Sequence, residues 1–266
     1  MRKTLLLAIS SLIWSHIETK INPWKDIVDF EGDILPPKNP GPLSGHTSLN
    51  HHNHKHGQHR RRQEGPTLWP NGVVPIKLDP STRTDFTDSE IWEINKAIGD
   101  FSRKTCIKFK KVNNERSYVK IVRLRTDECS SNVGKVGGVQ ELRLGSPRCF
   151  DKSVIIHELM HALGFYHEHN RKEAQKYIDV IFQNLRHGQR VDWHWHTKHH
   201  PVVKKSRYDI CSIMHYGAYA GSTWEFGDGR AIVDKYNLDR HCKNDMGFAK
   251  TFSKSDLKRI NKMYRC

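Results

Sequence analysis

Apolar side chains recur at regular intervals only in the later part of the chain, beyond about residue 68. Residues 72–78, "GVVPIKL", favour a strand, and Pro75 within them indicates an edge strand because proline cannot donate to a ladder. Thr87 and Glu90 fit a helix-capping box. The apolar residues that follow have helical spacing: Ile91, Ile94, Ile98 and Phe101.

Further alternation predicts two more strands, "TCIKFKKV" and "YVKIVRL", and residues 133–144 form a glycine-rich strand region. A helix is expected at about residues 153–163, ending before Gly164, a suitable C′ residue. After Tyr177 the pattern becomes irregular until "SKSDLKRINKMY" predicts a closing helix. The expected fold class is therefore α+β. A twisted mixed sheet with helices forms the first half, and a mostly irregular second half follows Gly164.

The N-terminus has the pattern of a secretory signal. Arg2 and Lys3 precede an apolar run at residues 5–14, which is too short to span a bilayer. We expect residues 1–15 to be a signal peptide, with an N-terminal buried helix as the alternative. No later segment is long and apolar enough to cross a membrane. The predicted location is secreted and extracellular.

Residues 36–66 are poor in large apolar side chains and rich in proline, glycine and histidine, so they cannot build a core. Six histidines lie between His46 and His59; a solvated tract is expected, and weak metal or pH-dependent binding is the alternative. Arg60, Arg61 and Arg62 offer a site for a trypsin-like or furin-like protease. We expect residues 16–62 to be a propeptide and residues 63–266 the catalytic domain.

Charge and cysteine content narrow the class of protein. Lysine and arginine total 44 against 29 acidic residues, a net charge of +15, which favours acidic substrates or polyanionic surfaces. No nucleic-acid fold signature is present. The six cysteines form no CxxC pair, and behind a signal sequence they predict three disulfides with 15 connectivities.

The chemistry is concentrated in "HELMHALGFYHEH", residues 157–169. His157 and His161 are four residues apart, so on a helix they share one face and suit a tetrahedral Zn²⁺. Gly164 permits a turn with positive φ, after which His167 can return as the third ligand. Glu158 is placed to act on a metal-bound water, taking its proton and passing it to the leaving amine. We expect His169 at the surface.

The pattern HExxHxxGxxH is that of the metzincin proteases, and "SIMHYG" at residues 212–217 supplies their methionine turn at Met214. The chain here resembles the astacin family in particular, over residues 68–266. The resemblance is carried by the extended motif with Phe165, Glu168 and Arg171, by the turn SxMHY and by the segments "LWPNGVVPI", "CSSNVGK" and "FSKSDLKRINKMYRC". The chain departs from the family in "EAQ" at residues 173–175 and in "DWHWHTKHHP".

The resemblance implies a two-subdomain catalytic domain with a zinc cleft between the halves, in prepro form and without additional C-terminal domains. It implies that Tyr216 ligates resting zinc and then stabilises the transition state. It also implies that Glu168 pairs with the new N-terminus after activation. A peptide substrate is expected to bind extended along an edge near residues 131–135.

The resemblance also gives a meaning to "DFEGDIL", residues 29–35, which lies in the segment to be removed. It is similar to the FxGD motif of astacin propeptides, met by Phe30, Gly32 and Asp33. In that family the aspartate ligates the zinc in place of water, so Asp33 is expected to be the zymogen switch. A carboxylate is a good zinc ligand at about 2.0–2.2 Å.

The resemblance selects one cysteine pattern. Cys106 is expected to pair with Cys266, and Cys129 with Cys149. We predict that the two that remain, Cys211 and Cys242, join and brace the floor of the zinc site. The histidines of "DWHWHTKHHP" are expected to lie in a solvated loop, with adventitious metal binding as the alternative: His194, His196, His199 and His200.

The predicted function is a secreted zinc-dependent endopeptidase made as a zymogen, with one Zn²⁺ per subunit. Its partners would be protein or peptide substrates, acidic ones being favoured, and an activating protease. The alternative is a catalytically silent secreted protein that keeps the protease fold and binds metal or matrix. The presence of Glu158 beside all three histidines favours the enzyme.

Overall fold

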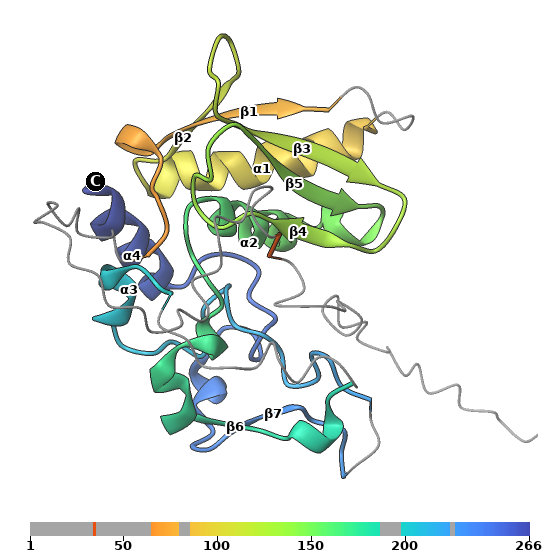
Figure 1. Ribbon diagram of the computed structural model, residues 1–266. Helices are drawn as coiled ribbons and strands as arrows, with labels where there is room; N and C mark the ends of the chain where they lie inside the picture. Colours follow the sequence, from red (N-terminus) through yellow and green to blue (C-terminus); the bar gives the residue numbers. More distant parts are fainter. Residues whose placement is uncertain (1–33, 36–64, 80–85, 187–197, 224–226) are drawn as a thin grey trace, which may run out of the picture.

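The computed structural model describes residues 34–35, 65–79, 86–186, 198–223 and 227–266. Its first half is built on a five-stranded sheet in the order β2-β1-β3-β5-β4 (Figure 1). Four strands run parallel to their neighbours and β4 runs antiparallel to β5, so the sheet is mixed as predicted. The strands are β1 (Val73–Leu78), β2 (Lys108–Lys111), β3 (Tyr118–Leu124), β4 (Cys129–Ser131) and β5 (Val139–Gly145).

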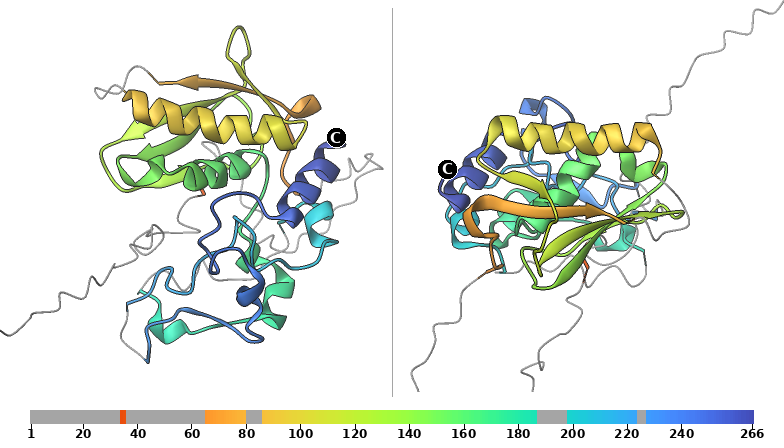
Figure 2. Two further views of the ribbon diagram at one scale, coloured as in Figure 1. Left: turned by 180° about the vertical axis from the view of Figure 1, so that it is seen from behind. Right: turned by 90° about the horizontal axis from the view of Figure 1, so that it is seen from above.

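Two helices accompany this sheet and pack against each other: α1 (Asp88–Lys104) and α2 (Lys152–Ala162) (Figures 1 and 2). The capping box predicted for α1 is present, because Thr87 accepts from the Glu90 N–H and Glu90 accepts from the Thr87 N–H. Asp151 caps α2 by accepting from the Ser153 N–H. Every residue of α2 from Ser153 to Ala162 is buried, so this helix runs through the core.

Pro75 does not mark an edge strand, because β1 lies between β2 and β3. The two ladders of β1 explain the difference. Pairing with β2 runs from Val73 to Ile76, whereas pairing with β3 begins only at Ile76. At Pro75 the strand therefore has a ladder on one side only, and its missing N–H disrupts no pairing with β3.

The second half has less regular structure, as predicted. It contains the two-stranded sheet of β6 (Ile178–Val180) and β7 (Ile232–Asp234), the short α3 (Pro201–Lys204) and the closing α4 (Lys254–Tyr264). A second apolar cluster, which includes Ile210, Ile232 and Met246, gives this half a small core of its own. The 3-10 helices of the described residues are Pro70–Gly72, Arg148–Phe150, Glu168–Asn170, Lys172–Lys176, Phe182–Asn184 and Leu238–His241.

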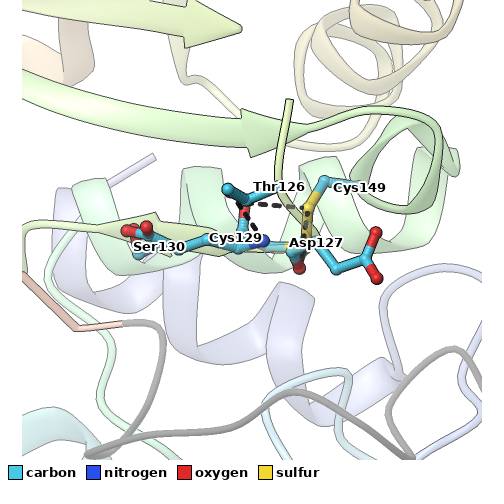
Figure 3. The surroundings of a disulfide bond; sticks show 6 residues. Thr126, Asp127, Cys129, Ser130 and Cys149 are labelled. Carbon is cyan, nitrogen blue, oxygen red and sulfur yellow. Dashed lines mark hydrogen bonds between the residues drawn. A yellow bond between two sulfur atoms is a disulfide. The ribbon is translucent and has the colours of Figure 1, made fainter. Parts of the chain in front are cut away.

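Three disulfides join the six cysteines in the expected pairs: Cys106–Cys266, Cys129–Cys149 and Cys211–Cys242. Figure 3 shows the second bridge, which links the first residue of β4 to the turn that precedes α2. This bridge therefore ties the edge strand to the start of the helix that carries the histidine motif.

Some of the sequence predictions concern residues that the structure does not describe. They are the signal peptide, most of the propeptide with Asp33 and the arginine triplet, and His194 and His196. Across the described ranges, no helix has the length and apolar character needed to cross a membrane.

The two described histidines of "DWHWHTKHHP" do not lie in a solvated loop, contrary to the prediction. His199 is 2% exposed, and its ring packs edge-on against Tyr166 with 5.7 Å between centroids. His200 is half-buried and caps α3, because its side chain accepts from the Val202 N–H. The short helix α3 packs on α4, and this contact draws the preceding histidines into the body of the protein.

Candidate metal centre

Two of the three predicted ligands project from α2. His157 and His161 are one turn apart and both are buried, at 1% and 0% exposure. The His157 Nδ1 atom lies 2.7 Å from the Ile213 carbonyl oxygen, and the His161 Nδ1 atom lies 2.7 Å from the Phe165 carbonyl oxygen. A carbonyl can only accept, so both rings carry their proton on Nδ1. The Nε2 lone pair of each ring is then left to face the centre of the site.

The third histidine arrives through the turn at Gly164. Gly164 has φ of +103°, and its N–H donates to the His161 carbonyl. A side chain would be strained at this φ, and its Cβ would lie 3.0 Å from Pro66 Cγ. The turn reverses the chain, and His167, which is fully buried, returns to face the other two rings.

The three Nε2 atoms form a small triangle. The distance between Nε2 atoms is 3.0 Å for His157 and His161, 3.1 Å for His161 and His167, and 3.3 Å for His157 and His167. Two lone pairs that converge at this distance repel each other unless a cation lies between them. Three ligands about 2.0–2.1 Å from a tetrahedral zinc would be roughly 3.3–3.4 Å apart. The residues present therefore fit zinc.

Glu158 and Tyr216 are the two further residues predicted for the site. Glu158 follows the first histidine and is completely buried. The Tyr216 ring lies 4.4 Å from the His167 ring between centroids, and Tyr216 remains half-buried rather than enclosed.

His169 does not lie at the surface, contrary to the prediction. It is 2% exposed, and its ring stacks on Tyr216 at 4.2 Å and on His167 at 5.2 Å. The 3-10 turn Glu168–Asn170 brings it back under the site instead of continuing outward. His169 is thus a packing partner of His167 and of Tyr216.

The methionine turn lies against the histidines and is held from α4. The Glu168 N–H donates to the Met214 carbonyl at 2.8 Å, and Met214 is buried. Asp256 of α4 accepts from the Ser212 hydroxyl at 2.6 Å and from the Ile213 N–H at 3.0 Å. Burial, followed by repulsion from Asp209, raises the pKa of Asp256 above its ordinary value. Ile213 in turn supplies the carbonyl that orients His157.

Glu168 lies at the centre of a buried ion cluster. Its carboxylate accepts from Arg171 at 2.8 Å, from two nitrogens of Arg259 at 2.8 Å each, and from the Asp209 N–H at 2.8 Å. These donors fill about as many sites as a carboxylate offers. A new N-terminal amine at Glu168, as the family resemblance implies, would have to share or replace one of them.

A second chain of contacts holds the Tyr216 backbone. His215 Nδ1 donates to the Tyr216 carbonyl at 2.7 Å, so its Nε2 accepts from the Tyr208 hydroxyl. Burial, followed by the charge of Glu168, raises the pKa of Tyr208 well above its ordinary value, which keeps the hydroxyl protonated. Burial lowers the pKa of His215, which keeps that ring neutral.

The edge strand β4 is already paired with an early segment of the chain. Ile34 forms a parallel bridge with Ser131, and the Leu35 N–H donates to the Ser131 carbonyl at 2.8 Å. Asn132 Nδ2 donates to the Leu35 carbonyl at 2.9 Å. Farther along the edge, the Lys135 N–H donates to the Thr67 carbonyl at 2.8 Å. Residues directly after Asp33 thus occupy the edge on which substrate binding was predicted.

Three supports of the site were not predicted from the sequence: Arg259, Asp256 and Tyr208. The first two had a readable signal. Asp256 and Arg259 share the apolar stripe of the closing helix with Ile260 and Met263, and a charge on such a stripe predicts a buried partner. Tyr208 has no comparable signal, because it lies in an irregular segment.

Comparison with known proteins agrees with the site. The family profile described as Astacin, a family of peptidases, matches residues 61–265. Zinc metalloproteinase nas-6 of Caenorhabditis elegans is 33% identical over 213 residues, which cover 76% of this chain and 58% of that protein. High choriolytic enzyme 1 of Oryzias latipes is 32% identical over 196 residues, covering 74% of this chain and 68% of that protein.

The solved structure of high choriolytic enzyme 1, described as a hatching enzyme zinc-protease from the medaka fish, matches with a TM-score of 0.65 at 29% identity. The match covers 76% of this chain and 95% of that one. This chain spans 58% and 37% of the length of two of its relatives, nas-6 and nas-14.

Proposed function

Because the chain belongs to the astacin family of peptidases, we propose that it is a zinc-dependent endopeptidase that hydrolyses peptide bonds of extracellular proteins. The observation that carries the proposal is the triangle of Nε2 atoms, with the protons of His157 and His161 held on Nδ1. Glu158, the residue after His157 on α2, is completely buried. The three Nε2 atoms are the donor set of a catalytic zinc with an open fourth position.

The proposed roles follow from the chemistry of each side chain. His157, His161 and His167 would hold the metal. Zinc held there would supply a Lewis acid that polarises a carbonyl and makes water more acidic. Glu158 is proposed to take a proton from the attacking water and to deliver it to the leaving amine. Tyr216 is proposed to donate its phenol to the developing oxyanion, with the His215–Tyr208 contacts fixing its backbone.

Substrate is proposed to add as a strand to β4, at Ser131 and Asn132. Support comes from the backbone pairing that Ile34 and Leu35 already make there. A protein rich in exposed cations would favour acidic substrates.

We also propose that the protein is secreted as a zymogen and activated by cleavage near the arginine triplet. Asp33, which lies outside the described residues, would be the zinc switch. Its support is the position of Ile34 and Leu35, which dock on the edge strand directly after it.

The test is cleavage of a peptide library by the trypsin-treated protein, with and without a zinc chelator. Glu158→Gln should retain zinc and lose at least about a thousandfold in kcat/KM, because the general base is removed. The matched control is Glu93→Gln in α1, the same chemical change at a partly exposed residue, which should leave kcat/KM unaltered. Full activity in Glu158→Gln, or in the chelated protein, would contradict the proposal.

The zymogen switch has a separate test in the uncut chain. Asp33→Ala should show measurable activity before cleavage, because a carboxylate ligand to zinc is lost. Asp29→Ala, in the same segment, should stay inactive. If Asp33→Ala is as silent as the parent, latency comes from steric cover alone.

The alternative function is a silent secreted protein that binds metal or matrix. It would be favoured if the activated parent chain holds zinc in its full stoichiometry and cleaves no member of the library.

A further inference from the structure

A cavity of about 860 Å³ lies behind the methionine turn, apart from the three histidines. One wall is the segment Arg207–Cys211 that leads into the turn, and the opposite wall is the start of α4 with the loop before it. The Cys211–Cys242 disulfide fixes the third side. The volume is in the range of pockets that hold small ligands or a few residues of a peptide.

The lining of this cavity has an apolar part. Phe252 belongs to the main core, whereas Tyr208 and the Cys211–Cys242 disulfide pack on the second core, and all of them border the cavity. The cavity therefore lies where the two cores meet, and an apolar side chain that entered it would find apolar partners on both sides.

The lining also has a cationic part. The exposed side chains of Arg207, Lys243, Lys250 and Lys254 border the same cavity, together with His241. Within the described residues, Arg207, Lys243 and Lys254 form no salt bridge, and Lys250 approaches Asp151 only at 3.7 Å. Like charges gathered around one concavity repel each other, so an anion that binds there is attracted by all of them.

The lining has one acidic side chain, Asp209, against these four cationic ones, so its net charge remains positive. Asp209 Oδ2 accepts from the Ser253 hydroxyl at 2.6 Å, and its Oδ1 accepts from the Cys211 N–H at 3.1 Å. Both carboxylate oxygens thus have a donor: the bond from Ser253 joins the two walls, and the bond from Cys211 lies within one wall. The combination of an apolar interior and a cationic rim excludes a cationic ligand, and the apolar floor gives a sulfated glycan little to contact.

We propose that this cavity is a binding site for an acidic peptide segment that carries a large apolar side chain. The apolar side chain would lie against Phe252 and Tyr208, and flanking carboxylates would pair with Lys243, Lys254 and Arg207. The site is separate from the zinc centre and goes beyond the proposed protease activity. Binding there requires neither zinc nor catalysis.

The probe is a fluorescein-labelled Glu-Glu-Phe-Glu-Glu peptide, titrated into the full-length uncut chain at about 150 mM salt, where charges near the surface still attract each other. Binding is followed by anisotropy. The parent should bind the peptide in the micromolar range. The double variant Lys243→Glu/Lys254→Glu should bind at least about tenfold more weakly, because two attractive contacts become repulsive. A Glu-Glu-Ser-Glu-Glu peptide should bind several-fold more weakly than the phenylalanine peptide, because the apolar contact is lost.

The matched control is Lys77→Glu/Lys262→Glu, which makes the same charge change on exposed positions outside the cavity. Lys262 lies two turns, about 12 Å, along α4 from Lys254. The control variant should alter the Kd by less than about twofold, because salt screens distant charges beyond roughly 8 Å. Thermal melting should show both variants folded. The proposal is overturned if the parent does not bind the peptide at about 1 mM, a concentration at which even weak specific binding is seen. It is also overturned if both double variants weaken binding equally, or if heparin binds in the cavity and the phenylalanine peptide does not.

Discussion

At the scale of single residues, the site is defined by where protons are held. Backbone carbonyls of Ile213 and Phe165 fix the protons of His157 and His161 on Nδ1, so the Nε2 atoms of both rings are left as acceptors that a metal could use. The sequence indicates the histidines but not the carbonyls, since Ile213 is 56 positions away from His157. Asp256 extends this control, because it holds the backbone that carries the Ile213 carbonyl.

The prediction for Asp256 concerns stability. In Asp256→Asn one carboxylate oxygen becomes an amide nitrogen, which cannot accept a hydrogen bond. If Oδ1 is replaced, the Ser212 hydroxyl loses its acceptor; if Oδ2 is replaced, the Ile213 and Ser253 N–H groups lose theirs. We expect a loss of about 1–3 kcal/mol in the free energy of unfolding. Urea unfolding of the oxidised chain measures it, with the exposed Asp245→Asn as the control. A difference below about 0.5 kcal/mol between these variants would argue against this role.

At the scale of elements, the sequence predicted correctly those features that depend only on neighbouring residues. The capping box of α1 and the glycine that ends the helical run of α2 are set by neighbouring residues, and both are present in the structure. Pro75 shows the limit of such signals. Its place between β2 and β3 depends on how far each ladder extends, which is decided by strands that come much later in the chain.

A pH prediction follows from the start of α1. Burial of Glu90 would raise its pKa, but hydrogen bonds from Arg123 and from the Thr87 N–H outweigh it, and the pKa is lowered below 4.5. A lowered pKa stabilises the fold above the unfolded value, and this stabilisation is lost as the pH falls through the folded value.

We therefore expect Glu90→Gln to be less stable than the parent at about pH 7 and the difference to shrink as the pH falls below about 4. Thermal melting between these two pH values measures this. Glu93→Gln, one turn away in a more exposed pair, serves as the control. A difference that is constant across the range would show that the Glu90 charge contributes nothing.

At the scale of the whole molecule, the two halves are joined by long-range contacts rather than by one continuous sheet. Arg259 of α4 binds Glu168 beside the third histidine, and the Cys106–Cys266 bridge ties the end of α4 to the segment before β2. The Tyr264 hydroxyl donates to the Leu163 carbonyl at the end of α2. Helix α4 thus holds α2 and the methionine turn in one arrangement.

The prediction at this scale concerns the disulfides. In the loop-entropy description, a bridge that closes 160 residues stabilises by about 5 kcal/mol and one that closes 20 residues by about 3 kcal/mol. Cys106→Ser/Cys266→Ser should therefore unfold at lower urea concentration than Cys129→Ser/Cys149→Ser. The reverse order would mean that residual structure in the unfolded chain, not loop length, governs the effect of these bridges.

The sequence by itself determined the class of fold, the family and the three histidines proposed as zinc ligands, because these depend on short spacings such as the four residues between His157 and His161. It also placed the capping box of α1 and the irregular second half. Only the tertiary structure decided which distant groups surround the site: the buried stack of His169, the ion cluster of Glu168, the Asp256 support and the cationic cavity. The physical reason is separation along the chain. A helix or a motif is fixed by neighbours within a few residues, whereas burial and pairing depend on which segments the packed cores bring together.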